Sequence, residues 1–236
     1  AAPTGREIVN VTPERAGWTH VGFRAVRLEA GAIEIVATGA RELCVVVLIG
    51  SVDVTIDGTT YANLGTRDSV FDDTSPAAVY IPAGKTVTVR VVCNAEVALC
   101  TAPCDAKDRM VRVIDPATMR RSVRGKGTNT RYPTNILPET ADADSLLVVE
   151  VITPGGQTSS YPPHRHDEDD LPRQSFLEET YYHRFSKPQG FGFQRVYTDD
   201  RSLDETVCFA DRDVVLVPRG YHPVGAPHGY TLFYLN

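Results

Sequence analysis

Histidine spacing in the second half of the chain suits the binding of a metal ion. His164 and His166 are separated by one residue, and His222 follows the turn Pro218-Arg-Gly220. In an extended segment, side chains alternate between two faces, so both imidazoles of the pair would point the same way and could bind one ion in adjacent positions. A lone His-x-His pair is weak evidence, because surface histidines often produce it, but its combination with a later histidine is more specific.

An acidic ligand is expected within the segment Leu177–His183. Alternation along a strand would place Glu179, Tyr181 and His183 on one face and Glu178 on the other. Three imidazoles and one carboxylate form a donor set that suits Zn²⁺, Mn²⁺, Fe²⁺, Co²⁺ or Ni²⁺. The sequence therefore predicts a site for one divalent metal ion, with Zn²⁺ as the first choice and the others as alternatives.

The elements that must position these residues are short strands. Runs of β-branched and apolar residues, bounded by Gly, Pro, Asp and Asn, recur along the chain, and stretches with helical period are nearly absent. This pattern indicates an all-β fold, built as antiparallel sandwiches or barrels. Because the final run ends at Asn236 in a strand-like pattern, we expect the sequence to continue. The predicted strands are 32–38, 43–49, 52–57, 79–81, 86–92, 146–152, 180–185, 191–198, 206–209, 214–217 and 230–235.

The chain contains two copies of one plan. Val79–Gly84 and Val215–Gly220 both read as a strand, a proline that ends its pairing and a glycine that permits a tight turn. The piece between the copies is polar and rich in arginine. We therefore predict an N-terminal half over 1–100, a connector over 101–145 and a C-terminal, metal-binding half over 146–236. The N-terminal half offers a single histidine, His20.

Composition excludes several classes of protein. The net charge of −6 gives no electrostatic reason to expect nucleic acid or an anionic membrane surface as a partner. No apolar run is long enough to span a membrane, and the start Ala1–Thr4 lacks a signal pattern. Five cysteines without a disulfide framework indicate reduced thiols. These features predict a cytoplasmic protein.

Several motifs carry a resemblance to a known family. The histidine pair, the glutamate and the Pro-x-Gly-x-His turn look like the two cupin motifs, with residues 167–178 as an inserted acidic loop. The residues Thr180-Tyr-Tyr182 after Glu179 resemble those after the ligand glutamate in related bicupin isomerases, which favours Glu179 over Glu178. The segments that resemble the 5-deoxyglucuronate isomerase family of bacterial myo-inositol breakdown are 159–167, 178–183, 194–198 and 217–223, with 67–72, 127–131 and 146–150 in support.

The resemblance implies a bicupin, with two antiparallel jelly-roll halves and a metal ion only in the second. The implied ligands are His164, His166, Glu179 and His222. The implied reaction is an aldose–ketose isomerisation of 5-deoxy-glucuronate to 2-deoxy-5-keto-gluconate. A divalent cation can hold the carbonyl and hydroxyl oxygens together and stabilise the negative charge that develops on them.

Proton transfer in such a reaction needs an acid–base group beside the metal ion. We interpret His183 as the candidate proton shuttle and Tyr181 as a residue that hydrogen-bonds the substrate or a ligand. Both are predicted to share the face of Glu179. A hydride shift between the two carbons would need no such base, and it stays open as an alternative.

The carboxylate of a sugar acid calls for a cation at its far end. Arg195 and Tyr197 alternate onto one face of their predicted strand and are the first candidates for substrate binding. Arg131, Arg124 and Lys126 in the connector are further candidates, and Arg131 is the one we select.

Two other functions fit the same ligands. One is a cupin dioxygenase that uses Fe²⁺, and the other is a non-catalytic, metal-stabilised protein that binds a sugar acid. Fold alone does not choose between them. We expect a small-molecule sugar acid as the partner, and a homo-oligomer because partner subunits often cover edge strands.

Overall fold

The computed structural model describes the chain from residue 6 to residue 236, so the residues that argue against an export signal lie outside it. Strands dominate this part of the chain. The helices described are one short α-helix and two 3₁₀ turns: α1 (Pro13–Ala16), η1 (Pro116–Thr118) and η2 (Gly127–Asn129). None of the described helices is long and apolar enough to cross a membrane.

The chain divides into two compact units. The N-terminal unit holds the residues through 120 together with 135–148, and the C-terminal unit holds 121–134 and 149–236. Residues 101–145, expected as a connector, are thus shared between the two units. Each unit is an assembly of antiparallel strands around its own core.

One large antiparallel sheet forms the N-terminal unit. Its strands follow the order β1-β2-β7-β4-β6-β8, with β3 paired to β7 and β5 paired to β4. The strands are β1 (Arg6–Val11), β2 (Gly22–Leu28), β3 (Ile33–Ala37), β4 (Arg41–Ile56), β5 (Thr59–Leu64), β6 (Ala77–Ile81), β7 (Thr86–Pro103) and β8 (Arg112–Ile114). Valine, leucine and isoleucine side chains fill its interior, and most of them are completely buried.

The two predicted strands 43–49 and 52–57 are one long strand, β4, with irregular register between Val47 and Val52. Gly50 lies at the irregularity with a φ of 78°, and a Cβ there would lie 2.1 Å from the carbonyl oxygen of Asn94. Only glycine fits such a close approach. The glycine therefore lets one strand bend where the sequence suggested a break.

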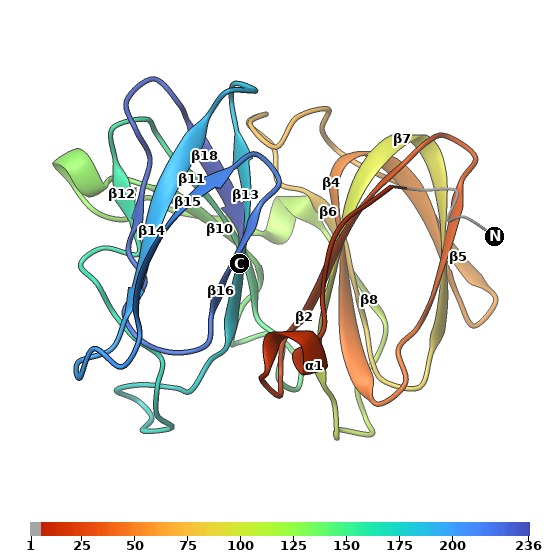
Figure 1. Ribbon diagram of the computed structural model, residues 1–236. Helices are drawn as coiled ribbons and strands as arrows, with labels where there is room; N and C mark the ends of the chain where they lie inside the picture. Colours follow the sequence, from red (N-terminus) through yellow and green to blue (C-terminus); the bar gives the residue numbers. More distant parts are fainter. Residues whose placement is uncertain (1–5) are drawn as a thin grey trace. The chain divides into compact units, whose positions relative to one another are not determined.

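Two sheets form the C-terminal unit, one in the order β16-β13-β18-β11-β10-β9 and one in the order β12-β17-β14-β15. Side chains from both sheets share one core, so the unit is a two-layer β-sandwich that wraps around its interior (Figure 1). The strands are β9 (Arg120–Arg121), β10 (Tyr132–Leu137), β11 (Val148–Thr153), β12 (Thr158–Ser159), β13 (Glu179–Phe185), β14 (Phe191–Tyr197), β15 (Asp204–Ala210), β16 (Val214–Val217), β17 (Val224–Gly225) and β18 (Leu232–Leu235).

β13 is the strand that matters most for function. It lies between β16 and β18, with Glu179 opposite Val217 and His183 opposite Tyr234. Tyr181 and Phe185 belong to the core of the unit, so the odd-numbered side chains of this strand point inward. The predicted alternation of Glu179, Tyr181 and His183 onto one face holds, and that face is the inner one.

Candidate metal centre

His164 and His166 lie in the loop between β12 and β13. The sequence had suggested an extended strand for them, and this expectation is not met. The loop is held near β13, because the backbone N–H of Leu177 donates to the carbonyl oxygen of His166 at 3.0 Å. The two rings still meet, with 5.1 Å between their centroids. The loop therefore brings both imidazoles together without strand pairing.

His222 completes a cluster with this pair. Its ring centroid lies 4.7 Å from that of His164 and 5.9 Å from that of His166. One nitrogen from each of the three rings lies within 4.8 Å of the others, and this is the one such group of histidine, cysteine or carboxylate side chains found within residues 6–236. Three predicted ligands from two distant segments thus converge.

Glu179 points one oxygen at the cluster. Its Oε1 lies 3.5 Å from Nε2 of His222 and 3.7 Å from Nε2 of His166, and it has no hydrogen-bond partner although it is buried. Its Oε2 accepts hydrogen bonds from the Tyr181 hydroxyl at 3.0 Å and from Nδ2 of Asn236 at 2.8 Å. The two donors fix the carboxylate so that Oε1 is left for a cation. Of the two neighbouring glutamates, Glu179 is the one that reaches the cluster.

The orientation of His222 also leaves one ring nitrogen free. Its Nδ1 lies 2.9 Å from the carbonyl oxygen of Gly220, which can only accept, so Nδ1 carries the proton. Nε2 then presents a lone pair that could bind a metal ion, and it is buried without a hydrogen-bond partner. The backbone N–H of Gly220 donates to Asp167 at 2.6 Å, which fixes this turn. Glycine is needed there, since its φ is 88° and a Cβ would lie 2.5 Å from the carbonyl oxygen of Tyr197.

These four side chains fit a divalent cation. With metal–ligand bonds of about 2.1 Å, neighbouring donors lie about 3 Å apart and opposite donors about 4 Å apart, which is close to the spacing found here. Burial lowers the pKa of His164 to about 4, with further lowering from His222 and His166. Its imidazole is therefore neutral near pH 7, the form that binds metal ions. Two of the donor atoms, Oε1 of Glu179 and Nε2 of His222, are buried without a hydrogen-bond partner, and such an ion would satisfy both.

Tyr181 lies at the edge of the cluster as a hydroxyl that keeps its proton. Its oxygen is 3.0 Å from Oε2 of Glu179 and 3.2 Å from Oγ of Ser160, and the residue is buried. Burial raises the pKa of Tyr181 well above its usual value, and the charge of Glu179 raises it further. A neutral phenol that donates to the outer oxygen of Glu179 holds that ligand in place.

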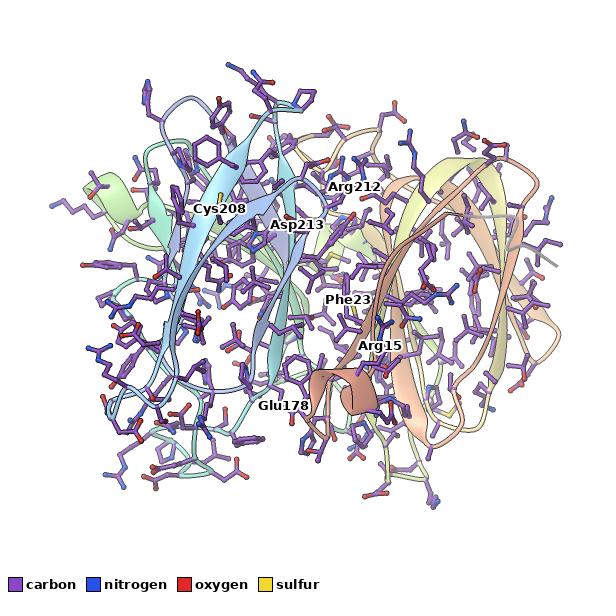
Figure 2. The ribbon with its side chains drawn as sticks, viewed as in Figure 1. Arg15, Phe23, Glu178, Cys208, Arg212 and Asp213 are labelled. Carbon is purple, nitrogen blue, oxygen red and sulfur yellow. The ribbon has the colours of Figure 1, made fainter. Side chains whose placement is uncertain are left out.

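His183 lies away from the cluster, further along β13. Its backbone N–H donates to the carbonyl oxygen of Asp213 at 2.9 Å. In Figure 2, Asp213 lies near one end of β13 and Glu178 lies at the other. His183 lies four positions after Glu179 along β13, a rise of about 13 Å. The structure therefore does not bring this predicted proton shuttle beside the metal ligands.

The His183 ring is buried against an aromatic side chain. It is fully buried and stacks on Phe209 with 3.6 Å between ring centroids. Burial lowers the pKa of His183 to about 3, and the Gln194 side chain offsets this effect only in part. Near neutral pH the imidazole is uncharged, so it has little tendency to accept a proton.

Arg195 and Tyr197 do share a face of β14, as predicted, but it is the outer face. The Arg195 guanidinium pairs with both oxygens of Asp204, through Nε at 2.7 Å and through a terminal nitrogen at 2.8 Å. It also lies 4.5 Å from the centre of the Tyr197 ring. The structure therefore does not bring these two predicted substrate-binding residues to the cluster, because the inward positions of β14 belong to its even-numbered residues, such as Gln194.

Arg131 lies between η2 and β10 and is half-buried. One of its terminal nitrogens donates to the carbonyl oxygen of Asn129 at 3.1 Å, and no ion pair of this side chain is found in the described part of the chain. Burial raises the pKa of Tyr234, a tyrosine of the inner face, and the charge of Arg131 is one of the smaller effects that oppose this rise. The ring of Tyr234 in turn lies 4.9 Å from that of Tyr181. Arg131 is thus the selected cation whose charge acts on a tyrosine of the inner face, next to Tyr181.

The sequence interpretation missed three inward-facing residues. Asn236 holds Glu179, Ser160 meets Tyr181, and Gln194 donates from Nε2 to the carbonyl oxygen of His222 at 3.2 Å. Alternation could have found Gln194, since it occupies the face opposite Arg195. Asn236 and Ser160 belong to no motif, so only the fold identifies them.

The comparisons with known proteins agree with this architecture. A family model described as the KduI/IolB family matches residues 1–236. The protein named 5-deoxy-glucuronate isomerase of Geobacillus kaustophilus is 48% identical over 229 residues, which are 97% of this chain and 83% of that protein. The protein of the same name from Bacillus subtilis strain 168 is 46% identical over 227 residues, or 96% of this chain and 83% of that protein.

Solved structures give the fold. The crystal structure of an IolB-like protein from Salmonella typhimurium matches with a TM-score of 0.94 at 44% identity, over 97% of this chain and 87% of that one. An oxalate decarboxylase from Lactobacillus farciminis matches with a TM-score of 0.64 at 13% identity, over 98% of this chain and 79% of that one. At such low identity the second match shows the fold alone. The predicted all-β bicupin fold is confirmed.

Proposed function

The chain belongs to the KduI/IolB family and is an isomerase, and we propose that it converts 5-deoxy-glucuronate to 2-deoxy-5-keto-gluconate with one divalent metal ion. The identity to curated isomerases, 48% over 97% of the chain, supports the reaction. The metal dependence is our inference from the residues. Its ligands would be His164, His166, Glu179 and His222.

The observation that carries the metal proposal is the pair of buried, unpartnered atoms at one point, Oε1 of Glu179 and Nε2 of His222. Two such atoms, 3.5 Å apart in a folded protein, need a shared partner that both can bind. We propose Zn²⁺ as that ion, because three imidazoles and one carboxylate suit it. The same donors also suit Mn²⁺, Fe²⁺, Co²⁺ and Ni²⁺.

A divalent cation held there would draw together the carbonyl and neighbouring hydroxyl oxygens of the sugar and stabilise the negative charge that grows on them during isomerisation. The residues of the chain hold the site for that chemistry. The turn at Gly220 presents Nε2 of His222, and the Tyr181 hydroxyl and Asn236 fix the carboxylate of Glu179. Tyr181 keeps its proton at neutral pH, so it acts as a hydrogen-bond donor and not as a base.

We propose Arg131 as the residue that binds the substrate carboxylate. It is a half-buried guanidinium whose charge reaches Tyr234, and Tyr234 lies beside Tyr181 in the interior. Guanidinium groups pair with carboxylates through two parallel hydrogen bonds, which would orient the far end of the sugar acid. Arg195 is not suited to this task, because its guanidinium is occupied by Asp204.

Metal analysis combined with an anaerobic isomerase assay on 5-deoxy-glucuronate tests the proposal. We expect about one metal ion per chain, with turnover lost on chelation and restored by metal without oxygen. Turnover that needs oxygen would instead identify a dioxygenase. Bound metal without any turnover on this substrate would indicate that the protein only binds its ligand or that it acts on another sugar acid.

Two arginine variants sharpen the substrate assignment. Arg131→Ala should raise KM by about 10-fold or more, since a charge-assisted pair contributes about 1.5–3 kcal/mol. Arg195→Ala is the matched control and should leave KM unchanged. An unchanged KM in Arg131→Ala would remove this residue from the proposed site.

We also propose the cytoplasm as the compartment of this protein. All five cysteines are free, which fits reducing surroundings.

A further inference from the structure

The acidic loop over residues 167–178, which directly follows His166, has an order of its own. Its two ends are held together by the hydrogen bond from the backbone N–H of Leu177 to the carbonyl oxygen of His166, at 3.0 Å. Inside the loop, the backbones of Asp170 and Gln174 exchange two hydrogen bonds, at 2.9 and 3.1 Å. The loop is therefore a closed, hydrogen-bonded segment that begins at a proposed metal ligand.

Asp167 is the first residue of this loop, and its carboxylate reaches the segment that carries the third histidine. Oδ1 of Asp167 accepts a hydrogen bond at 2.6 Å from the backbone N–H of Gly220, which lies 53 positions further along the chain. The side chain is largely buried, with 19% of its area exposed. A charged acceptor makes a stronger hydrogen bond with a backbone N–H than a neutral one does. This bond joins the loop of His164 and His166 to the turn of His222.

Gly220 is the flexible point of that turn. Because glycine has no side chain to restrict its φ and ψ, hydrogen bonds at the two flanking peptides decide its orientation. The peptide on its C-terminal side is held by β14, since the backbones of Tyr221 and Tyr197 exchange hydrogen bonds at 2.8 and 2.9 Å. The peptide between Arg219 and Gly220 is the one that Asp167 holds. A strand thus fixes one side of the glycine and the loop fixes the other.

The same glycine orients the third histidine. Its carbonyl oxygen accepts from Nδ1 of His222 at 2.9 Å, which leaves Nε2 for the cluster. A backbone carbonyl that accepts from the second nitrogen of a metal-binding imidazole fixes both the tautomer and the direction of the ring. A rotation of the Gly220 backbone would therefore redirect the imidazole, and Asp167 opposes such a rotation.

We propose that Asp167 is a positioning residue of the metal centre. Its hydrogen bond to Gly220 acts as a clasp that holds the loop of His164 and His166 against the turn of His222, so that the three imidazoles meet at one point. Asp167 is not a member of the histidine cluster and acts on it through Gly220. The clasp rests on the proposed metal site.

The test compares Asp167→Ala with Asp167→Asn, each loaded with Co²⁺ or Zn²⁺. The readouts are the visible absorption of bound Co²⁺, which reports ligand geometry, and the Zn²⁺ dissociation constant from chelator competition. Asp167→Ala removes the acceptor, so it should weaken Zn²⁺ binding by about 10-fold and change the Co²⁺ spectrum, because residues behind a ligand typically contribute about 10–100-fold. Asp167→Asn keeps an oxygen that can accept from Gly220, so it should restore the wild-type spectrum and most of the affinity.

Asp169→Ala is the matched control. Asp169 lies in the same loop, and its Oδ1 also accepts from a backbone N–H, that of Phe176 at 2.9 Å, but this bond stays within the loop. The control should leave affinity and spectrum unchanged.

Amide hydrogen exchange of Gly220 measures the clasp itself. This amide should be protected in the metal-loaded wild type and in Asp169→Ala, and it should exchange faster in Asp167→Ala. Fast exchange in the wild type would overturn the clasp, whether or not the variants fold.

Wild-type affinity and spectrum in Asp167→Ala would overturn the proposal, because the strand pairing of Tyr221 would then hold the turn by itself. Equal losses in Asp167→Ala and Asp167→Asn would also overturn it, since they would assign the effect to the charge of Asp167. Equal losses in Asp169→Ala would assign it to the order of the loop instead. A failure of the proposed function differs from all three, because the wild-type protein itself would then bind neither Co²⁺ nor Zn²⁺, or would bind them without isomerase turnover.

Discussion

The two units use one strand plan for different purposes. β4 pairs with β6 so that Leu43 and Val45 lie opposite Ile81 and Val79, and β13 pairs with β16 so that Glu179 and Tyr181 lie opposite Val217 and Val215. Ile81 and Val217 both precede the proline of the repeated turn. The inward row Leu43-Val45-Val47 in the N-terminal unit thus corresponds to Glu179-Tyr181-His183 in the C-terminal unit.

This difference shows how a site is built on a fold. The row of the N-terminal unit is apolar and belongs to its core. The row of the C-terminal unit carries a carboxylate, a phenol and an imidazole, all buried. Burying polar groups costs free energy unless they are paired, so the second row is less stabilising than an apolar row. The hydrogen bond between Tyr181 and Glu179 offsets part of this cost.

The largest effect should come from removing a ligand in the C-terminal unit. His222→Ala should reduce the metal content to near zero and activity by at least about 1000-fold, equivalent to about 4 kcal/mol. Metal analysis and the isomerase assay measure both. His228→Ala is the matched control, because His228 is exposed and outside the cluster. Retention of metal in His222→Ala would remove this residue from the ligand set.

In the N-terminal unit the corresponding row should affect stability only. Leu43→Ala opens a cavity in a closed core and should lower the free energy of unfolding by about 2–5 kcal/mol. Urea unfolding gives this value, and the metal content of the folded protein should stay at that of wild type. Metal loss at full folding would contradict a purely structural role for this row.

Each unit has a buried tyrosine whose hydroxyl donates to a glutamate, and replacing the two tyrosines compares the units further. The hydroxyls of Tyr181 and Tyr80 donate to Glu179 at 3.0 Å and to Glu42 at 2.6 Å. Tyr181→Phe should weaken Zn²⁺ binding by about 10-fold, because it frees the outer oxygen of a ligand. Tyr80→Phe should lower stability by about 1–3 kcal/mol and leave Zn²⁺ affinity unchanged. Equal Zn²⁺ affinities in the two variants would show that Tyr181 does not position Glu179.

The smallest effect concerns pH. The pKa of His183 is about 3 when folded and near 6.5 when unfolded, so between these values the unfolded state binds more protons. The free energy of unfolding should therefore fall as pH drops below 6.5, by about 1.4 kcal/mol per unit for this group, with no contribution above that pH. Urea unfolding of metal-free protein at pH 7.5 and 5.5 should show this loss in wild type and not in His183→Phe. An equal loss in both would contradict the assignment.

The all-β bicupin plan and the three histidines of the candidate cluster could be predicted from the residues alone. Short β-branched runs and a repeated Pro-x-Gly turn define the strands, because a period of two residues and the backbone limits of proline and glycine act locally. His164, His166 and His222 could be selected because their residue types and spacing are themselves chemical information. Alternation predicted that Glu179 and Tyr181 share one face of their strand.

The residues that surround this cluster depend on packing between remote segments of the chain. Alternation predicts that Arg195 and Tyr197 share a face, but it does not say which face is inward, and the packing of β14 put Gln194 inside. The distance of His183 from the ligands and its loss of basicity arise from depth in the core, which no local pattern records. Asn236 and Ser160 reach Glu179 and Tyr181 from remote parts of the chain, and a hydrogen bond between remote residues leaves no trace in local spacing.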